Sequence, residues 1–556
     1  MSAEKNVMAS RAVFTAVMML IIMLMLVLRL FQIQIVQGKS YSLKAINQRM
    51  LNLPLDFSRG QFYDANMIPL TGRETVDSLV VFPALVEDKK KAAAVIADMT
   101  GIDHDNALEG LRQASSPYKL PLTENRHTVS VGDTKGIMAV TDIKRYDETS
   151  KARHLIGYTD KSDKVGRAGL EKLYENYLAG DGEVTVAAMV DGSKRLIPGL
   201  GYKLINGGQR ENRYNLQLTI DYHIQKIVEE VVDEHGIEGA ALVLEVENGG
   251  ILAMASRPNY AQDNVGKYLQ GERGELLNKA FQQYNLGSIF KTIVAAAVLE
   301  DNLVNPFETV NCPGYIQVGE LQIKCSSYDS GGHGGLNIFE AYAESCNTFF
   351  IEMGQRVGGE KIINLAGAFG LGEIVGVNPL EEQSGVLPSD KGLHKSDVCN
   401  ISIGQGDILV TPLQVAAMTN IIANNGISKK PYVVKALIDG SGKVTPLPGD
   451  EEPKRVISPF VATEIRRMME MVVDYGTGTG AALPGLEKTA GKTSSAQTGQ
   501  KISGQDVVHA WFTGYTPRIY PKYVITVFAE NGRSGGSVAA PVFRDIAKRV
   551  LELGER

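Results

Sequence analysis

The sequence predicts an α+β protein with a membrane anchor, an elongated mixed N-terminal domain and a C-terminal domain built on an antiparallel sheet. Three observations predict this organisation: a charge-free apolar run near the N-terminus, a change of composition near Tyr214, and strand-like segments at both ends of the region 214–556 with helical segments between them. With 556 residues, 44% of them hydrophobic and 22% charged, the chain is long enough for two or more domains with their own cores.

The first element is the apolar run from Ala12 to Leu28, AVFTAVMMLIIMLMLVL, which contains no charge. Such a run can span a bilayer, and Lys5 and Arg11 on its N-terminal side favour a cytoplasmic N-terminus. The alternative is a cleaved signal peptide, but no small-residue cleavage site follows the run. We therefore expect a cytoplasmic segment over 1–11, a transmembrane helix over 12–34, and the remaining chain on the outer face of the membrane.

The region 35–213 is polar and carries no pair of residues typical of catalysis. Its clearest elements are an alternating strand in DSLVVFPALV (Asp77–Val86) and a helix in KKKAAAVIADM (Lys89–Met99). The formal net charge of the chain is -6 and its basic residues are scattered, so the composition gives no electrostatic footprint for nucleic acid.

The region 214–556 begins with a strand followed by an amphipathic helix in NLQLTIDYHIQKIVEEVVDEHG. Two apolar strands joined by a Glu-Asn-Gly-Gly turn follow in GAALVLEVENGGILAMAS (Gly239–Ser256), which predicts a hairpin. Near the C-terminus, HAWFTGYTPRIYPKYVITVFAE predicts further strands and AAPVFRDIAKRVLEL a closing helix. We expect these distant strands to form one sheet, covered by an otherwise helical part.

A buried helix with two polar residues at its start is predicted by LGSIFKTIVAAAVL (Leu286–Leu299). A helix that begins near Ser288 places Lys291 on the same face, one turn further on. A buried ammonium is costly unless its pKa falls, and a lysine with a lowered pKa can take the proton of a serine hydroxyl. Taken alone, the pattern also fits an N-cap serine and a lysine that extends to water.

Two later motifs favour a catalytic role for Ser288 and Lys291. Ser345 and Asn347 lie in AESCNTFF, and Lys492 and Thr493 lie in AGKTSSAQTG. The order S-x-x-K, S-x-N and K-T resembles the three-motif set of the penicillin-binding proteins and serine β-lactamases. A single motif of this kind is weak, whereas three in the same order are specific.

The resemblance extends over most of the chain and is to a class B penicillin-binding protein, a membrane-anchored D,D-transpeptidase without a glycosyltransferase domain, of the elongation or spore-cortex type. It implies a pedestal (dimerisation-like) domain over 35–213, for which an inert spacer is the alternative, and a penicillin-binding/serine β-lactamase-like transpeptidase domain over 214–556. Family-like segments are SRGQFYDAN, HLIGYTD, GRAGLEKLYENYLAG, LTIDYHIQ, HGGLNIFEAYAESCN, IGQGDILVTPLQ and HAWFTGYTP.

The resemblance also implies catalytic roles. Ser288 attacks the carbonyl of the penultimate D-Ala of a stem peptide and forms an acyl-enzyme. Lys291 is the base for acylation, although the identity of the base is disputed in this superfamily. Ser345 passes a proton towards the leaving amine. No cofactor and no metal is expected.

Further residues are expected to bind the substrate. The Asn347 amide holds the amide of the peptide, and Lys492 and Thr493 receive the substrate carboxylate. The backbone amides of Ser288 and Ser495 form the oxyanion hole.

One residue departs from the family pattern: the third motif is normally Lys-Thr-Gly or Lys-Ser-Gly, and this chain has Ser494 in place of the glycine. In a regular strand Ser494 shares a face with Lys492, so its side chain is expected on the cleft side, where it crowds the acyl group. A milder change is Leu286, where proline is usual.

The chain contains four cysteines: Cys312, Cys325, Cys346 and Cys399. They are expected to be buried thiols, or Cys325 and Cys346 form a redox-sensitive disulfide that restrains the S-x-N motif, as the resemblance to spore-cortex members implies. Zinc is not expected, because no C-x-x-C pair occurs and His333 is the only histidine nearby.

The sequence therefore favours a peptidoglycan D,D-transpeptidase that cross-links stem peptides and is acylated by β-lactams. The alternative is a catalytically weakened homologue that acts as a structural partner of a polytopic glycan polymerase. A β-lactamase or antibiotic sensor fits poorly with the large N-terminal domain. The expected partners are stem peptides, β-lactams, the cytoplasmic membrane and that polymerase.

Overall fold

The chain forms two compact units in a computed structural model, and each unit is assembled from separate stretches of sequence. Unit 1 contains Met1–Ser58, Thr75–Lys144 and Gly182–Gln209, and unit 2 contains Arg59–Glu74, Arg145–Asp181 and Arg210–Arg556. The structure describes residues 2–38, 41, 50–54, 59–123, 134–161, 164–179, 184–191, 195–197, 201–206, 213–303, 305–319, 321–447, 452–485, 488–502 and 504–554.

The domain boundary expected at Tyr214 differs from this division. Unit 2 begins its long final stretch at Arg210, close to the expected position, but Arg59–Glu74 and Arg145–Asp181 also belong to it. The expected domain 35–213 therefore contributes to both units. Met1 of the expected cytoplasmic segment, and several ranges within 35–213, lie outside the described residues.

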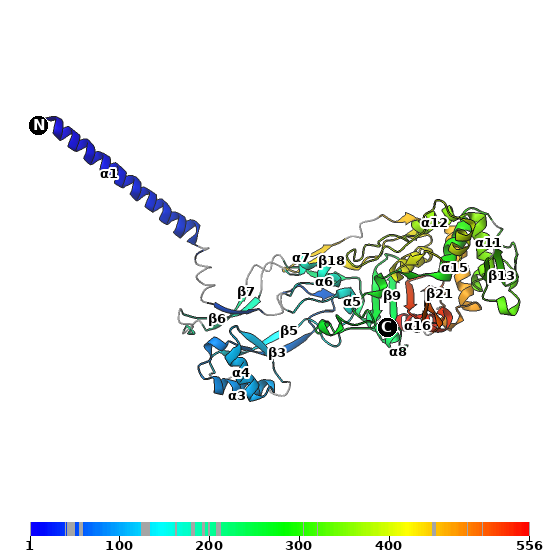
Figure 1. Ribbon diagram of the computed structural model, residues 1–556, viewed down its shortest axis with the longest axis horizontal. Coiled ribbons are helices and arrows are strands. Elements are labelled where there is room, and N and C mark those ends of the chain that lie inside the picture. Colours follow the sequence, from blue (N-terminus) through cyan, green and yellow to red (C-terminus); the bar gives the residue numbers. More distant parts are fainter. Residues whose placement is uncertain are drawn as a thin grey trace. The chain divides into compact units, whose positions relative to one another are not determined.

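The N-terminal apolar run is helical, as predicted. The helix α1 spans Ser2–Phe31 and continues as a short π-helix over Gln32–Val36 (Figure 1). Residues Val13–Val36 form a stretch with a mean hydropathy of 2.6, long and apolar enough to cross a membrane. The expected anchor over 12–34 agrees with this stretch to within two residues at each end.

Besides α1, the described residues of unit 1 form two three-stranded sheets, in the orders β1-β6-β7 and β4-β3-β5, and two further α-helices. Strand β3 (Glu74–Val81) buries both faces: Leu79 and Val81 pack against α3 (Lys89–Thr100), and Val80 packs on the opposite side. The predicted helix is confirmed, whereas the predicted strand ends at Val81 and Pro83–Leu85 form a 3-10 turn, because proline cannot donate to a strand ladder. The remaining elements of unit 1 are β1 (Met50–Pro54), β4 (Tyr118–Pro121), β5 (Ile137–Lys144), β6 (Val184–Met189), β7 (Tyr202–Asn206) and α4 (His104–Gln113).

Unit 2 is organised around a five-stranded antiparallel sheet in the order β10-β9-β23-β22-β21. The predicted hairpin forms β9 (Gly239–Glu245) and β10 (Ile251–Arg257), and the C-terminal strands β21 (Ala490–Ile502), β22 (Gln505–Thr516) and β23 (Tyr523–Ala529) complete the sheet. Figure 1 shows the green β9 beside the orange and red strands from the end of the chain. The predicted single sheet is thus confirmed, with β21 at its edge.

Both faces of this sheet are covered by helices. Ala241 and Val243 of β9 face α8 (Tyr222–Glu234) and the C-terminal α16 (Ala540–Gly554), whereas Leu242 lies in the main core on the other face. That core contains the helical part of the unit: α9 (Lys291–Glu300), α10 (Ile338–Ala343), α11 (Asn347–Val357), α12 (Gly359–Ala368), α13 (Lys395–Ile401), α14 (Pro412–Ala423) and α15 (Pro459–Asp474).

Short ladders complete unit 2. A four-stranded sheet has the order β19-β18-β8-β2, and its strand β2 (Phe62–Tyr63) comes from one of the two early stretches. The other strands of this sheet are β8 (Asn215–Leu218), β18 (Val434–Ile438) and β19 (Val444–Pro446). Two-stranded ladders join β12 (Val310–Cys312) to β15 (Gly334–Leu336), β13 (Tyr315–Val318) to β14 (Leu321–Lys324), β11 (Tyr284–Asn285) to β16 (Leu409–Val410) and β17 (Ile427–Ser428) to β20 (Lys454–Arg455).

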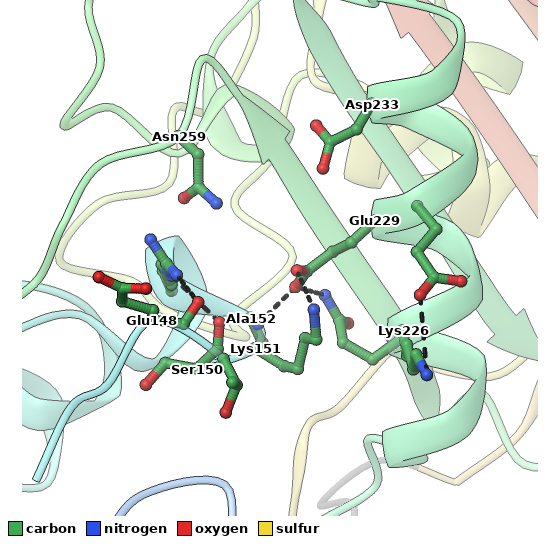
Figure 2. A network of polar contacts seen from close by, with 12 residues as sticks. Glu148, Ser150, Lys151, Ala152, Lys226, Glu229, Asp233 and Asn259 are labelled. Carbon is green, nitrogen blue, oxygen red and sulfur yellow. Dashed lines mark hydrogen bonds and ion pairs between the residues drawn. The ribbon is translucent and has the colours of Figure 1, made fainter.

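A buried carboxylate of α8 explains why the second early stretch joins unit 2. Figure 2 shows Glu229 pointing from α8 towards Lys151 and Ala152. Glu229 accepts hydrogen bonds from the Ala152 amide at 2.7 Å and from Gln225 Nε2 at 2.8 Å, and Lys151 Nζ lies 3.4 Å away. Because a buried carboxylate needs such partners, α8 and residues 150–153 stabilise each other.

A second buried carboxylate, Glu171, joins the two early stretches to each other. It accepts from Arg59 Nε at 2.7 Å, Arg145 Nε at 2.5 Å and the Tyr146 hydroxyl at 2.7 Å. Burial alone would raise the pKa of Glu171, but the charges of Arg145 and Arg59 hold it below its usual value. The ionised carboxylate is therefore part of the folded structure.

We expect Glu171→Gln to lower the free energy of unfolding of unit 2 by about 3 kcal/mol, because it leaves two buried guanidinium groups without their shared counter-charge. Urea unfolding of the full chain in detergent, followed by the fluorescence of the single tryptophan, Trp511, measures the change. Glu352→Gln is the matched control, since this side chain pairs with Arg356 but is 39% exposed, and it should cost less than about 1 kcal/mol. Equal urea midpoints for the two variants would contradict the assignment.

Candidate active site

The first part of the site is the turn that carries Ser288. Residues Gly287–Phe290 form a 3-10 turn, and α9 begins at Lys291 rather than at Ser288 as predicted. Side chains three residues apart are aligned in a 3-10 turn, so the two polar groups still meet. Lys291 Nζ lies 3.1 Å from Ser288 Oγ, and the lysine side chain is fully buried.

Close backbone packing fixes this turn. Gly287 has φ +64°, a conformation that favours glycine, and its amide donates to the Gly404 carbonyl at 3.0 Å. A Cβ on Gly404 would lie 2.0 Å from the carbonyl oxygen of Gly287, and a Cβ on Gly287 would lie 2.5 Å from Ser494 Oγ. The nucleophile turn is therefore held between the edge strand β21 and the loop before β16.

Lys291 is surrounded by acceptors. Its Nζ lies 2.6 Å from the Ser345 carbonyl, 2.7 Å from Asn347 Oδ1 and 3.2 Å from Ser345 Oγ. Burial lowers the pKa of Lys291 to about 8, a shift that the charges of Cys346 and Cys325 partly oppose. A neutral amine can donate to the Ser345 carbonyl and Asn347 while its lone pair faces the Ser288 hydroxyl, which is the arrangement that a general base requires.

The S-x-N motif lies between α10 and α11. Ser345 adopts φ +55°, an uncommon conformation for a residue with a side chain, and it places the serine hydroxyl between two lysines. Its Oγ lies 3.2 Å from Lys291 Nζ and 3.1 Å from Lys492 Nζ. The first two predicted motifs and Lys492 of the third are thus brought together around one hydroxyl.

Lys492 and Thr493 lie on the edge strand β21. Burial and the charge of Lys291 both lower the pKa of Lys492 well below its usual value, because two ammonium groups cannot share this small buried space at low cost. Thr493 Oγ1 lies 2.6 Å from Thr477 Oγ1. A bound carboxylate would restore the charge of Lys492 and leave Lys291 neutral.

Ser494 lies on the same face of β21 as Lys492, as predicted, but its hydroxyl is already engaged. Its Oγ donates to the Leu286 carbonyl at 2.6 Å, and the side chain is buried against Gly287. This hydrogen bond ties the edge strand to the nucleophile turn. Ser494 also lines the active-site cavity, so the expected crowding of the acyl group stays a prediction.

A cavity of about 700 Å³ opens over these groups, and its lining includes Ser288, Ser345, Asn347, Thr493 and Ser495. Ser495 Oγ accepts from the Gly535 amide at 3.1 Å, which ties the middle of β21 to the segment before α16. The two residues expected to supply oxyanion amides, Ser288 and Ser495, therefore border one cavity. Their role remains a prediction.

Sequence reasoning missed several residues in the cavity lining: Glu344, Gln405, Thr477 and Arg533. Thr477 lies in the segment YGTGTG between α15 and β21, which has no recognisable pattern of periodicity or charge. Only its contact with Thr493 identifies it, so no signal in the sequence could have found it.

The cysteines fall into two groups. Cys312, Cys325 and Cys346 are buried free thiols that converge with His333, and the four ligand atoms lie within 4.8 Å of one another. Cys399 lies apart and accepts from Gln355 Nε2 at 3.0 Å. The sulfurs of Cys325 and Cys346 are 3.8 Å apart, so their pairing stays a prediction. The expectation that no zinc is bound rested on spacing in the sequence, whereas these four side chains come from separate segments, and it stays a prediction.

Two family models match the chain. The penicillin binding protein transpeptidase domain matches residues 239–548, and the penicillin-binding protein dimerisation domain matches residues 55–197. The first match includes every predicted catalytic residue.

Several curated relatives match nearly the whole chain, and two of them illustrate the likeness. Stage V sporulation protein D of Bacillus subtilis is 28% identical over 572 residues, covering 98% of the chain and 86% of that protein. The peptidoglycan D,D-transpeptidase MrdA of Haemophilus influenzae is 28% identical over 620 residues, covering 98% of the chain and 92% of that protein.

Solved structures show the same fold. Penicillin binding protein 3 from Mycobacterium tuberculosis, complexed with aztreonam, has a TM-score of 0.65 and 25% identity, covering 91% of this chain and 97% of that one. The penicillin-binding protein PBP2 of Helicobacter pylori, in complex with MreC, has a TM-score of 0.68 and 25% identity, covering 91% of this chain and 99% of that one.

The lowered pKa of Lys291 predicts how acylation depends on pH. Below about pH 8 the fraction of neutral amine rises about tenfold per pH unit, so the second-order rate of acylation by a fluorescent penicillin should rise from pH 6 and level off above pH 8. The other titratable groups facing this amine are Lys492, Cys325 and Cys346. A rate independent of pH between 6 and 9, after correction for hydrolysis of the free penicillin, would exclude Lys291 as the base.

The hydrogen bond of Ser494 predicts the effect of its removal. Ser494→Ala should slow acylation about fivefold, which corresponds to about 1 kcal/mol for one buried hydrogen bond, and Ser494→Gly should be no faster than wild type. Thr498→Ala is the control. Thr498 lies further along β21 and its hydroxyl also donates to a carbonyl, that of Val507 on β22. Faster acylation of the glycine variant would instead support the crowding expected from the sequence.

Proposed function

The chain belongs to the penicillin-binding proteins with a transpeptidase domain, as its motifs predicted, and we propose that Ser288 is the nucleophile of its peptidoglycan D,D-transpeptidase reaction. As a member of this family the protein acts on peptidoglycan and is acylated by β-lactams. The observation that supports the role of Ser288 most directly is the 3.1 Å between its hydroxyl and the buried amine of Lys291.

Acylation begins when Ser288 Oγ attacks the carbonyl carbon of the penultimate D-Ala of a stem peptide. The hydroxyl proton passes to the neutral Nζ of Lys291, whose two other hydrogen bonds to the Ser345 carbonyl and Asn347 keep its lone pair directed at the serine. The resulting oxyanion is stabilised by the backbone amides of Ser288 and Ser495, which need no reorganisation at the moment of reaction.

Collapse of this intermediate breaks the peptide bond and releases the terminal D-Ala. Its amine must receive a proton, and the Ser345 hydroxyl can deliver one because it lies within 3.2 Å of the Lys291 amine, which has just accepted it. The product is an ester between Ser288 and the shortened stem peptide. Lys291 returns to the neutral form.

The terminal carboxylate of the donor peptide is received by Lys492 and Thr493. The carboxylate offsets the cost of a charged Lys492 in this buried position, and the threonine hydroxyl, oriented by Thr477, donates a second hydrogen bond. A substrate without this carboxylate leaves Lys492 unpaired, so the pair selects for the C-terminal end of the peptide.

The second half-reaction transfers the acyl group to an amine. The amine of a neighbouring stem peptide attacks the ester carbonyl, Lys291 accepts the proton lost by the attacking nitrogen, and Ser288 leaves with a proton restored. The product is an amide cross-link between two strands. Asn347 supports this step by holding the amide of the donor peptide.

The alternative of a catalytically weakened structural partner rested mainly on Ser494. Its hydroxyl is satisfied by the Leu286 carbonyl, and the space beside it exists because residue 287 is glycine. This geometry supports an active enzyme.

The anchor helix α1 holds the enzyme at a membrane through a single pass. We propose that the N-terminus is cytoplasmic and the catalytic unit extracytoplasmic, because Lys5 and Arg11 precede the span and peptidoglycan lies outside. The apolar surface of α1 is exposed along its length, so a polytopic glycan polymerase that packs against it is the proposed partner. The H. pylori relative is seen with MreC instead, which is the competing partner class.

Substitution of the nucleophile tests the proposed function. In Ser288→Ala, covalent labelling by fluorescent penicillin should be lost, and Lys291→Ala should slow labelling by at least about a hundredfold at neutral pH, because no other base lies within reach of the hydroxyl among the described residues. Intact-protein mass spectrometry measures the acyl adduct, and circular dichroism confirms the fold.

Two surface variants serve as controls, Ser441→Ala in an exposed turn and Lys361→Ala on α12. Both should label at the wild-type rate. Labelling of Ser288→Ala at the wild-type rate would show that another residue is the nucleophile.

A further inference from the structure

One carboxylate lines the active-site cavity, and the proposed reaction gives it no role. Of the described residues in the cavity lining, Lys324 and Arg533 are cationic and Glu344 alone is anionic. Lys324 Nζ lies 4.1 Å from the centre of the Tyr328 ring. Glu344 is partly buried, and its carboxylate makes no hydrogen bond or ion pair with any residue that the structure describes.

The fold gains nothing from this carboxylate. Glu344 is the C-cap residue of α10, where a negative charge lies beside helix carbonyl groups that repel it. Glu340 stands four residues earlier, and like charges at this spacing also repel each other. The Glu340 carboxylate has a structural task, since it accepts from the Asn337 amide at 3.0 Å, whereas Glu344 has none. A local rule broken without a structural gain is typical of a functional position.

Main-chain contacts place Glu344 at the end of the cavity that receives the donor carboxylate. The Ala343 carbonyl accepts from the Thr477 amide at 3.1 Å, and the Thr477 hydroxyl lies 2.6 Å from that of Thr493. The next residue, Ser345, is the one that delivers a proton to the leaving amine in the proposed reaction. Glu344 therefore borders the space of the leaving D-Ala.

The second substrate of the proposed reaction enters through the same space. Release of D-Ala and attack by an amine on the ester are the same step in opposite directions, so the acceptor amine must attack from the position that the leaving amine has vacated. An aliphatic amine is protonated at neutral pH and arrives as a cation. Lys492 borders this space, and any positive charge on it repels an incoming ammonium unless an anion offsets that charge.

We propose that Glu344 binds the ammonium group of the acceptor peptide and directs it to the ester of Ser288, an inference that rests on the proposed function. The acceptor class is a peptide with a primary aliphatic amine. A carboxylate on the wall of a cavity raises the local concentration of such a cation and holds it beside the ester.

The proton balance of the transfer leaves Glu344 ionised throughout. The bound ammonium loses one proton to water and becomes a neutral amine. As its nitrogen forms the bond to the ester carbonyl carbon, a further proton passes to Lys291, and the Ser288 oxygen takes that proton when the ester bond breaks. Glu344 therefore acts on the binding of the acceptor and not on the acylation of Ser288.

The test separates acyl transfer from acylation in the full chain, purified in detergent. The donor is the thioester of N-acetyl-D-alanine with thioglycolate, which acylates Ser288 and releases a thiol. Two acceptors compete with water for the acyl group: Nα-acetyl-lysine amide, whose amine is cationic at neutral pH, and methoxyamine, which is uncharged there. Chromatography measures the amide and acid products as the acceptor concentration rises.

Glu344→Gln should raise the concentration of Nα-acetyl-lysine amide needed for half-maximal transfer by at least about tenfold, because a charge-assisted hydrogen bond is lost. Transfer to methoxyamine should be unchanged, since this acceptor has no charge for the carboxylate to bind. Glu344→Asp keeps the charge and should retain a preference for the cationic acceptor. Glu360→Gln on α12 is the matched control, because it removes an exposed carboxylate outside the cavity, and it should behave as wild type with both acceptors.

Penicillin labelling of the same samples gives the second readout. Glu344→Gln should be labelled at least as fast as wild type, because a neutral side chain repels the carboxylate of the incoming penicillin less than an anion does. Slower labelling, together with an equal loss of transfer to both acceptors, would show that Glu344 only supports the local fold, and it would overturn the inference.

Two further results would overturn the role of Glu344 while leaving the proposed function intact. The first is an equal half-maximal concentration of Nα-acetyl-lysine amide in Glu344→Gln and wild type. The second is a wild-type chain that forms the acyl-enzyme but transfers it to water alone. A wild-type chain in which neither penicillin nor the thioester acylates Ser288 would instead overturn the proposed function, and the inference with it.

Discussion

The buried amine of Lys291 is the constraint on which the site depends. An ammonium enclosed by an apolar helix is costly, and the chain meets that cost with acceptors from a distant segment, the Ser345 carbonyl and Asn347 Oδ1. Those contacts fix the S-x-N motif against α9. Their position in turn sets where Lys492 can lie, because it shares the hydroxyl of Ser345. The three motifs are therefore held together by one polar network in an otherwise apolar core.

Close packing of backbone supports this network from outside. Gly287, Gly404 and Ser494 lie so near one another that two of the three positions accept no side chain. The serine on β21 is then compatible with the glycine in the nucleophile turn, and the two residues act as a pair. Such a turn resists displacement when a bulky acyl group enters, because the atoms nearest to Gly287 belong to Ser494 and Ala496, whose short side chains have little freedom to move.

The sequence predicted the features that depend on neighbouring residues, and it missed the contacts that form between distant segments. The hairpin of β9 and β10, the closing helix and the spacing of Ser288 and Lys291 depend on neighbours in sequence, and they were predicted correctly. The alternation along β21 predicted which face of the strand Ser494 occupies, but not that its hydroxyl donates a hydrogen bond to the Leu286 carbonyl. The cluster around His333 draws single residues from four segments, so no spacing pattern marks it. The same is true of Glu171, whose partners come from two separate early stretches.

The division of the chain has a consequence for how such proteins can be altered, by evolution or in the laboratory. The chain passes between the two units five times, after residues 58, 74, 144, 181 and 209. The catalytic unit is therefore not encoded by one contiguous piece of gene, and a fragment that starts at Tyr214 lacks Lys151 and Ala152, the partners of Glu229. Exchange of this unit between relatives by a single recombination event would separate partners that must remain together. Swaps that preserve function have to carry the two early stretches along with the rest.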